Sequence, residues 1–510
     1  MSKNPQTPGR HEGQRLSPWR VSVGVLVCLA VIFGIAAVPW YISEHAPTSS
    51  TSAGPRWYGG YFDVTAASVT ENPVVDSEAP GAVVLAFVVA ASPTTCSPSW
   101  GAAYSLSDAG SQLDLDRRVD TMRRDGAHVA VSFGGAINTE LASACSSVDD
   151  LVSAYRAVLD RYNVTTIDLD LEGTNLTDVA AGERRAQALA ILQQERLDAG
   201  QELDVWVTLP TAMAGLTEQG VAAVRQLLDG GVNLTGVNAM VMNYGTGLGD
   251  LSMADASIEG LEAVHDQLAS LYAERRIALP PGGAWALMGA TPMIGQNDIR
   301  EEVFTLADAQ TLSVFAQERE LARMSMWSIN RDRECGPNYP DLTVVSDACS
   351  GVPQSVTFAS VLAAGFDEAP ADTATLAPVA TPVPDDPATS PYPIWSPDRA
   401  YSAGVKVVWH GYIYVAKWWV TGAPEPDDPT LAAEQTAWTL VGAVMADDEP
   451  YALPTVAAGT YPSWDSAVLY EKGDRVVVDG VPFEAKWWNE GEDPVEGITD
   501  HDRSPWAVVG

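Results

Sequence analysis

Thr165-Thr-Ile-Asp-Leu-Asp-Leu-Glu172 is the most informative segment of the chain, because acidic and apolar side chains alternate along it. In a strand, this alternation sends Asp168, Asp170 and Glu172 to one face and the apolar side chains between them to the other. Such a strand suits a closed parallel barrel, in which one face of each strand points inward and the other packs against helices. A solvated edge strand is the alternative, and it leaves the regular apolar positions unexplained.

Three carboxyls on one strand face, about 7 Å apart, cannot all ionise at low cost. At least one pKa is therefore expected to rise, which leaves a proton donor near neutral pH. Cleavage of a glycosidic bond requires a positioned carboxylic acid of this kind. The pattern predicts a glycosidase site at Asp168, Asp170 and Glu172, at the mouth of the barrel where such enzymes hold their active sites.

Short apolar runs alternate with amphipathic helical patterns from Trp57 to Phe366. One such helix is expected at 147–162, where Ser147 can cap the first turn. The predicted strands are Trp57–Asp63, Ala82–Val89, His128–Gly134, Thr165–Glu172, Leu203–Leu209, Val237–Tyr244, Leu287–Ile294 and Met324–Ile329. Eight strands alternating with helices predict an α/β fold, the (β/α)8 TIM barrel. A doubly wound open sheet is the alternative, but no glycine-rich nucleotide loop follows the first strand.

Charge and composition narrow the class of substrate. The formal net charge is −37. A field of that sign repels nucleic acid and anionic polymers, so we expect an uncharged substrate and no nucleic-acid partner. The cysteines form no CxxC pair and the 6 histidines are scattered, so neither a metal nor another cofactor is predicted. We expect the chain to be a monomer.

Residues 21–43 contain no charged side chain, and their apolar run is long enough to span about 30 Å of hydrocarbon as a helix. The basic residues within 1–20 predict a cytoplasmic tail, and a Ser/Thr/Pro-rich stalk, 44–56, would follow outside the cell. The prediction is a single-pass membrane anchor with an extracellular barrel. Secretion after cleavage of a signal peptide is the alternative, although the apolar region of such peptides is about 7–15 residues long.

Four cysteines lie outside the predicted anchor, in a compartment that the anchor implies is oxidising. Three pairings are possible. We favour a short local loop, Cys335–Cys349, together with Cys96–Cys145.

An internal repeat with an offset of 68 or 69 residues follows a linker rich in Pro, Ala and Thr, 367–393. The repeat predicts two small all-β modules, 394–442 and 462–510, joined by a second linker, 443–461. Nine of the 16 tryptophans lie in this part of the chain. That number exceeds what two small cores need, so some rings are expected to be exposed for ligand stacking.

The region from Trp57 to Phe366 resembles bacterial chitinases of glycoside hydrolase family 18. The fourth strand of that family carries D-x-x-D-x-D-x-E, which 165–172 matches in its last three acidic positions. The third strand ends S-x-G-G, found here as Ser132-Phe-Gly-Gly135. Met242-Asn-Tyr244 on the sixth strand and Trp327 on the eighth complete the match.

This resemblance implies a role for each matched residue. Glu172 is implied as the general acid, Asp170 as the residue that orients the N-acetyl group of the substrate, and Asp168 as the holder of the Asp170 proton at rest. Tyr244 is implied as a hydroxyl donor to the acetamido oxygen, and Trp327 as the floor under the distorted sugar. The further residues that it places against the substrate are Met242, Asn243, Gly134 and Gly135. Gly245 stands where the family often has Asp, and Asn243 is expected to replace that group if its side chain points inward.

The two C-terminal modules resemble carbohydrate-binding modules of the family 5/12 type, whose signature includes the string Ala-Lys-Trp-Trp at 416–419 and 485–488. The resemblance implies that both modules bind chitin. The implied stacking residues are Tyr401, Trp418 and Trp419 in the first module and Tyr470, Trp487 and Trp488 in the second.

The expected function is hydrolysis of β-1,4 bonds between N-acetylglucosamine units, with retention through the acetamido group of the substrate. An endo-β-N-acetylglucosaminidase or a peptidoglycan-acting glycosidase of the same fold is the nearest alternative. A catalytically silent chitin-binding lectin is an alternative from another class, but silent relatives typically lose the acid, and Glu172 is present. A purely structural surface protein leaves the three carboxyls unexplained.

Overall fold

Eight parallel strands close into a barrel in the first part of the chain. The computed structural model describes residues 55–66, 81–366, 368, 385–422, 424–428, 431, 435–445 and 448–509. The barrel strands are β1 (Trp57–Asp63), β2 (Ala82–Ser92), β5 (His128–Gly134), β6 (Thr166–Asp170), β7 (Asp204–Ala212), β9 (Leu234–Met240), β10 (Met288–Thr291) and β13 (Arg323–Met324). They pair in that order, and β13 pairs with β1 to close the ring. Each predicted strand overlaps one of them, so the predicted TIM barrel is confirmed.

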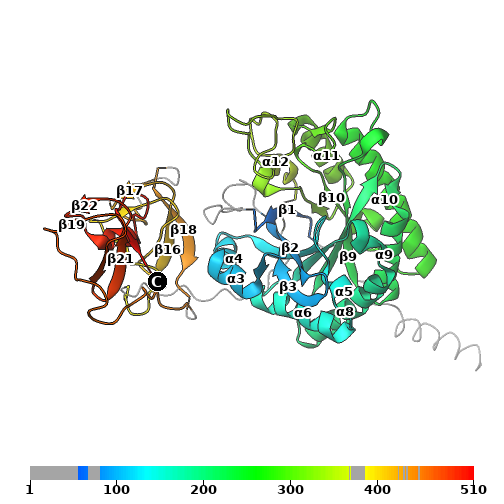
Figure 1. The fold of residues 1–510 in the computed structure, drawn as a ribbon. Helices are drawn as coiled ribbons and strands as arrows, with labels where there is room; N and C mark the ends of the chain where they lie inside the picture. The colour runs from blue at the N-terminus through cyan, green and yellow to red at the C-terminus, as the bar shows by residue number, and fades with distance from the viewer. Residues whose placement is uncertain are drawn as a thin grey trace, which may run out of the picture.

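Helices surround the barrel (Figure 1). They are α3 (Leu106–Gln112), α4 (Leu115–Arg124), α5 (Leu141–Ala144), α6 (Val148–Tyr162), α7 (Gly173–Thr177), α8 (Val179–Asp198), α9 (Glu218–Asp229), α10 (Met253–Arg275), α11 (Leu306–Glu318) and α12 (Phe358–Leu362). The predicted helix at 147–162 is α6. Ser147 caps it by accepting a hydrogen bond from the Asp150 backbone, and the helix ends at Asn163, whose left-handed φ of 45° suits asparagine.

Five short strands lie outside the closed ring: β3 (Thr95–Trp100), β4 (Tyr104–Ser105), β8 (Gly215–Leu216), β11 (Gly295–Gln296) and β12 (Val303–Phe304). Both predicted disulfides, Cys96–Cys145 and Cys335–Cys349, are present. The first joins β3 to the residue that follows α5.

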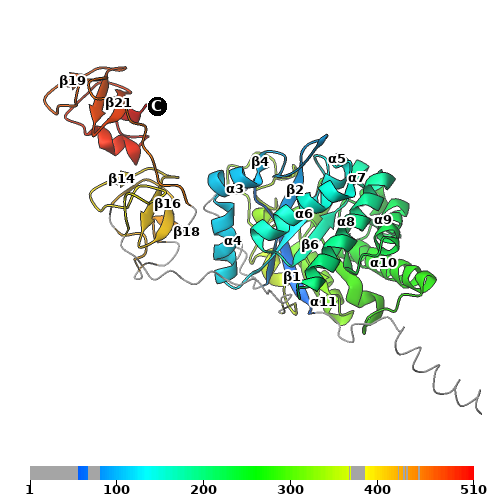
Figure 2. The same ribbon diagram turned by 90° about the horizontal axis from the view of Figure 1, so that it is seen from below.

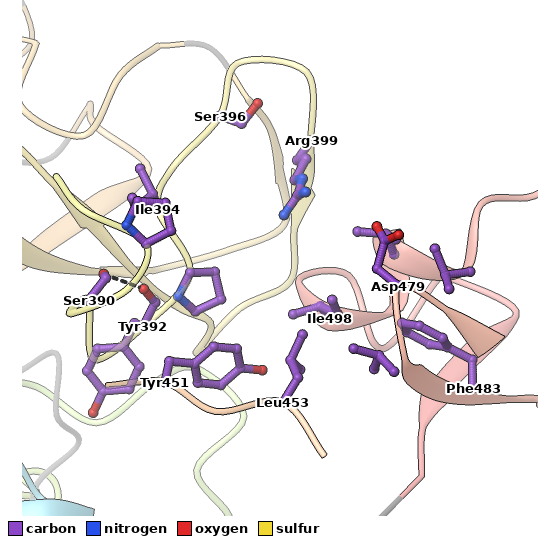
Figure 3. A pocket seen from close by; sticks show the side chains of 15 residues that line it. Ser390, Tyr392, Ile394, Ser396, Arg399, Tyr451, Leu453, Asp479, Phe483 and Ile498 are labelled. Atoms are coloured by element: carbon purple, nitrogen blue, oxygen red, sulfur yellow. Dashed lines mark hydrogen bonds between the residues drawn. The ribbon is translucent and has the colours of Figure 1, made fainter. Parts of the chain in front are cut away.

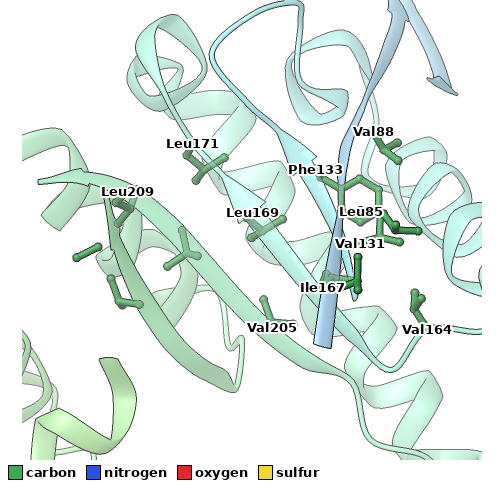
Figure 4. Close-up of a cluster of buried hydrophobic side chains, with 14 of the residues drawn as sticks. Leu85, Val88, Val131, Phe133, Val164, Ile167, Leu169, Leu171, Val205 and Leu209 are labelled. Carbon is green, nitrogen blue, oxygen red and sulfur yellow. The ribbon is translucent and has the colours of Figure 1, made fainter. Parts of the chain in front are cut away.

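The two faces of β6 belong to different layers, as its alternation predicts. Ile167, Leu169 and Leu171 are buried between the barrel and the helices, where Phe133 of β5 lies near them (Figure 4). The opposite face points into the barrel, whose interior also holds a separate apolar cluster that includes Trp206. The carboxyls of β6 therefore lie inside the barrel.

Two small β modules follow, and they repeat one topology. The first consists of β14 (Ala400–Tyr401), β15 (Lys406–Trp409), β16 (Tyr412–Ala416), β17 (Val420–Thr421) and β18 (Trp438–Ala443). The second consists of β19 (Leu469–Tyr470), β20 (Arg475–Val478), β21 (Val481–Ala485), β22 (Asn489–Glu490) and β23 (Trp506–Val508). In each, a two-stranded ladder joins the first and fourth strands, and the other three form a second sheet.

The predicted stacking roles of Tyr401 and Tyr470 are wrong, because both rings belong to the cores of the modules. Tyr401 packs edge-on against Trp438 at 5.1 Å and Tyr470 against Trp506 at 5.0 Å. Both rings are buried, so neither offers a face to an external sugar. Their hydroxyls bond to the backbone of Ser396 and Asp465.

The N-terminal predictions lie outside the described residues. The predicted tail, anchor and most of the stalk fall within 1–54, which the structure does not describe. In the described part of the chain, no helix combines the length and the apolar character that crossing a membrane requires. The predicted linker 367–393 is also shorter than expected: Asp385 already accepts hydrogen bonds from the backbone of His410 and Gly411, so 385–393 packs with the first module.

Candidate active site

Asp168 lies at the base of the carboxyl row, and each of its oxygens accepts two hydrogen bonds. The hydroxyls of Tyr61 and Ser132 donate to Oδ2, both at 2.8 Å. Thr208 Oγ1 and Arg323 Nη1 donate to Oδ1, both at 2.7 Å. A carboxylate has about four acceptor positions. All four are used by these donors, and the predicted role of Asp168 as the holder of the Asp170 proton stays a prediction.

Arg323, which the sequence did not single out, is the cation of this site. It begins β13, is fully buried, and its guanidinium lies 4.9 Å from the ring centre of Trp57 and 5.5 Å from that of Trp206. The aromatic faces stabilise a cation that has left water. Arg323 and Asp168 thereby form a buried ion pair inside the barrel.

Asp170 is the second carboxyl of the row, and its Oδ1 is buried without a hydrogen-bond partner. Burial raises its pKa well above the usual value, and the negative charges of Glu172 and Asp168 raise it further, while Arg323 opposes them. Asp170 is therefore a buried acid with one oxygen left free for a donor on a ligand.

Gly134 and Gly135 hold the backbone of Asp170 in place. The Gly135 N–H donates to the Asp170 carbonyl at 3.0 Å. Gly134 has a φ of 108°, and a Cβ there would lie 2.1 Å from the same carbonyl oxygen. Only glycine allows this close approach. The two residues thus position the acid from behind, while their predicted contact with substrate stays a prediction.

Glu172 lies two residues beyond the end of β6, at the mouth of the barrel, and is half-buried. Its backbone caps α7, but its side chain makes no capping bond and is free for chemistry. Burial raises its pKa, and the charge of Asp298 raises it further. A raised pKa keeps the carboxyl protonated at higher pH, as a general acid needs.

Asn243 and Asp298 form a reciprocal pair next to this acid. Asn243 Nδ2 donates to Asp298 Oδ2 at 2.8 Å, and the Asp298 N–H donates to Asn243 Oδ1 at 3.1 Å. The Asn243 side chain thus faces the group that acts on Glu172. Asp298, which the sequence did not identify, is the carboxylate whose negative charge raises the Glu172 pKa.

The structure places the Tyr244 hydroxyl away from the carboxyls. It donates to Ser257 Oγ of α10 at 3.2 Å. Burial raises the Tyr244 pKa, and the negative charge of Glu302 raises it further. Glu302 accepts the backbone N–H groups of Tyr244 and Gly245, which holds the loop in this position. The predicted contact of Tyr244 with the acetamido oxygen stays a prediction, and it would require the hydroxyl to change its partner from Ser257. Met242 is half-buried, and its role stays a prediction.

Aromatic rings line the inner side of the site. Trp327 is half-buried and stacks on Phe87, with ring centres 5.4 Å apart and planes inclined by 20°. Tyr61 lies at 6.2 Å from Trp327, so the ring that holds Asp168 also adjoins this surface. Phe87 was not predicted. The described residues contain no group of His, Cys, Asp and Glu arranged to hold a metal ion.

The four tryptophans of the Ala-Lys-Trp-Trp strings are all exposed. The exposed fractions are 46% for Trp418, 37% for Trp419, 43% for Trp487 and 60% for Trp488. All four indole side chains are therefore partly on the surface, although the Arg503 guanidinium lies over the Trp419 ring.

Comparisons with known proteins agree with the barrel and the second module. The chain is 32% identical over 331 residues to a probable bifunctional chitinase/lysozyme of Escherichia coli, which covers 63% of this chain and 34% of that protein. It is 31% identical over 326 residues to endochitinase 11 of Metarhizium anisopliae, covering 62% of this chain and 57% of that protein. The chain thus spans about a third and about half of the lengths of these curated relatives.

A solved structure and a family profile extend the comparison. The catalytic domain of a hyperthermophilic chitinase from Pyrococcus furiosus aligns with a TM-score of 0.51 and 29% identity, covering 61% of this chain and 95% of that domain. The profile of carbohydrate-binding module family 5/12 matches residues 463–507.

Barrel, carboxyl row and relatives agree on one class: this chain is similar to glycoside hydrolases. Within that class, the predicted resemblance to family 18 chitinases is confirmed for the barrel. Residues 463–507 form a carbohydrate-binding module of family 5/12.

Proposed function

We propose that this enzyme hydrolyses β-1,4 bonds between N-acetylglucosamine units of chitin, with retention at the anomeric carbon. The observation that carries the proposal is the unequal state of the three carboxyls. Asp168 has all its acceptor positions filled, Asp170 has a free oxygen, and Glu172 stands half-buried at the mouth. The names of the relatives support the choice of chitin.

In the proposed reaction, Glu172 gives its proton to the glycosidic oxygen as the bond from that oxygen to the anomeric carbon breaks. The acetamido oxygen of the same sugar forms a new bond to the anomeric carbon from the opposite face, which produces an oxazolinium ion. The free oxygen of Asp170 accepts the acetamido N–H and faces the positive charge. Water then adds to the anomeric carbon and gives a proton to Glu172. The bond from the acetamido oxygen to the anomeric carbon breaks, which opens the oxazolinium ring and leaves the product with retained configuration.

Product analysis tests this mechanism. Incubation with N-acetylglucosamine oligomers should give the β anomer first by proton NMR, and a fully deacetylated oligomer should not be cleaved. An inverting enzyme needs a second carboxylate roughly 6.5–9.5 Å away to activate water, and would give the α anomer. An α-anomeric first product, or hydrolysis of the deacetylated oligomer at a similar rate, would contradict the mechanism.

Peptidoglycan is the second candidate substrate, because the name of the Escherichia coli relative includes lysozyme activity. Mass spectrometry of products from chitin and from purified cell walls separates the two candidates. A chain that binds chitin and cleaves neither polymer would instead be the lectin.

For location, we propose a single-pass anchor at 21–43, supported by its uncharged apolar run after a basic tail. Protease added to intact cells should release a fragment that begins near 44–56. A barrel protected from the protease would contradict this orientation, and a soluble chain lacking 1–43 would support secretion.

A further inference from the structure

The first module is docked on helix α4 of the barrel by charged groups from both sides. Figure 2 shows the module beside this helix. Arg117 Nη2 donates to both oxygens of Asp448, at 2.6 and 2.7 Å. Lys406 pairs with Asp114, which is itself buried and makes no capping bond to α4. Hydrogen bonds between charged groups are stronger than neutral ones, so these two pairs favour one placement of the module on α4.

Backbone contacts make the same interface close. Thr121 Oγ1 donates to the Val441 carbonyl at 3.0 Å. A Cβ at Gly442 would lie 2.2 Å from Arg117 Cγ, so glycine is required where β18 passes over the helix. The module therefore packs against the barrel with no layer of water between these groups.

In the second module, the cation at the position of Lys406 pairs with groups of its own module. Arg475 occupies the repeat position of Lys406, and Tyr461 that of Tyr392. Arg475 donates to Glu484 at 2.8 Å and to the Tyr461 hydroxyl at 3.0 Å, both in its own module. Docking on the barrel is thus a property of the first copy.

Asp500 joins the second module to the first. Its side chain is buried, although it belongs to the second module, and two of its partners lie in the first. Ser402 Oγ donates to it at 2.6 Å and Trp419 Nε1 at 2.8 Å. A buried carboxylate without these donors would carry a large desolvation cost, so the contact stabilises the pair of modules.

Trp419 is also covered by a cation from the second module. The Arg503 guanidinium lies 3.7 Å from the centre of the Trp419 ring. Its counterpart Trp488 is the most exposed of the four tryptophans, at 60%. With an offset of 69 the repeat positions of Asp500 and Arg503 in the first module are Leu431 and Glu434, and with an offset of 68 they are Ala432 and Gln435. Neither offset gives an acidic residue followed by a basic one. The carboxylate and the cation of this contact therefore come from the second module, and the tryptophan that they hold comes from the first.

A cavity of about 440 Å³ lies beside this contact, between the modules and away from the carboxyl row (Figure 3). Ile394 and Arg399 of the first module, Leu453 of the connector, and Phe483 and Ile498 of the second module line it. Two modules and their connector thus enclose a common hollow.

We infer that the first module is a structural bridge that holds the second module at a fixed position on the barrel, and that the second module provides the chitin-binding face through Trp487 and Trp488. The inference rests on the chitin binding of the proposed function. It differs from the expectation that both modules bind chitin. The family match at 463–507 falls in the module that we assign to the ligand.

Paired substitutions in the full-length protein test the assignment of the ligand. W487A/W488A should weaken adsorption to insoluble chitin by about tenfold or more, as loss of two central aromatic contacts does. The control Trp418→Ala, which leaves the Trp419–Asp500 contact in place, should change adsorption by less than about twofold. Unchanged thermal unfolding of both variants shows that their modules are folded. An equal loss in the control would overturn the inference, whereas a wild-type protein that binds no chitin overturns the proposed function with it.

Charge exchange tests the bridge without any ligand. Arg117→Glu should release the first module, which should increase the radius of gyration in small-angle X-ray scattering and speed proteolysis within 443–461. The double variant R117E/D448R should restore both values, because it exchanges the charges of one ion pair. A wild-type protein that scatters as an ensemble of freely moving modules, or a double variant no better than the single one, would contradict the bridge.

Discussion

The guanidinium of Arg323 donates to Asp168 Oδ1 at 2.7 Å in the interior of the barrel, and both side chains are almost fully excluded from solvent. The two residues are 155 positions apart, with Asp168 on β6 and Arg323 on β13. Their pairing neutralises one of three stacked carboxyls. The remaining two, Asp170 and Glu172, are then the groups whose protonation can change near the substrate.

Arg323→Met should destabilise the barrel strongly. Removing one partner of a buried ion pair leaves an unpaired charge and typically costs about 3–5 kcal/mol in the free energy of unfolding. The double variant D168N/R323M removes both charges and should recover part of that loss in a denaturant titration. A double variant less stable than the single one would contradict the ion pair as the cause.

The same substitution should shift the pH profile of kcat on N-acetylglucosamine oligomers. Arg323 opposes the rise of the Asp170 pKa, so its removal raises that pKa further. The proposed mechanism needs Asp170 ionised, and the acidic limb should therefore move to higher pH. A limb that stays in place while activity falls would limit Arg323 to a structural role.

Glu172→Gln should lower kcat by about 100- to 10,000-fold, because it removes the proton donor and keeps the shape of the side chain. The thermal unfolding midpoint should not fall, since the raised pKa means that the buried carboxylate gains little from its surroundings. Adsorption to chitin is the control. Near-normal turnover would place the acid elsewhere.

Asp298→Asn should move the basic limb of the kcat profile to lower pH. The negative charge of Asp298 adds to the burial that raises the Glu172 pKa, so its removal lowers that pKa and the acid loses its proton sooner. The folded state binds the Glu172 proton more tightly than the unfolded state. Wild-type stability should thus fall as pH rises from the usual carboxyl pKa through the raised one, and less steeply in the variant. An unchanged limb would contradict the role of Asp298.

Gly134→Ala should reduce both stability and turnover, because its Cβ would meet the Asp170 carbonyl oxygen at 2.1 Å. Gly126→Ala is the matched control: Gly126 has a φ of 94°, close to the 108° of Gly134, but no atom lies within 4 Å of its added Cβ. The control loses stability only through the strained backbone conformation. The difference between the two variants therefore measures the cost of the clash with the Asp170 carbonyl oxygen. Equal effects in thermal unfolding would contradict it.

Local patterns predicted much of this molecule. The alternation in 165–172 gave the inward carboxyls, and the repeat gave two modules of one topology. Contacts between distant segments were not predictable in the same way. Arg323 looks in sequence like the charged edge of an apolar strand, and only closure of the barrel brings it to Asp168.

The position of Tyr244 shows a second limit. Strand β9 ends at Met240, so strand alternation no longer determines where the following side chains point. Asn243 takes a left-handed φ of 56°, which turns the chain before Tyr244. The Ala-Lys-Trp-Trp strings show a third limit, because identical letters in the two modules meet different neighbours: Trp419 lies under Arg503, whereas Trp488 is open to solvent.

The close approach of Gly442 to Arg117 has a consequence for recombination of this gene. A breakpoint at residue 366 separates Asp114 and Arg117 from Lys406 and Asp448, and leaves charged groups of α4 without their counterions. A breakpoint between Tyr451 and Trp464 keeps those pairs together, but it separates Asp500 and Arg503 from Trp419. The barrel with its first module can therefore be exchanged as one heritable unit, and an incoming second module must bring its own carboxylate and cation for Trp419.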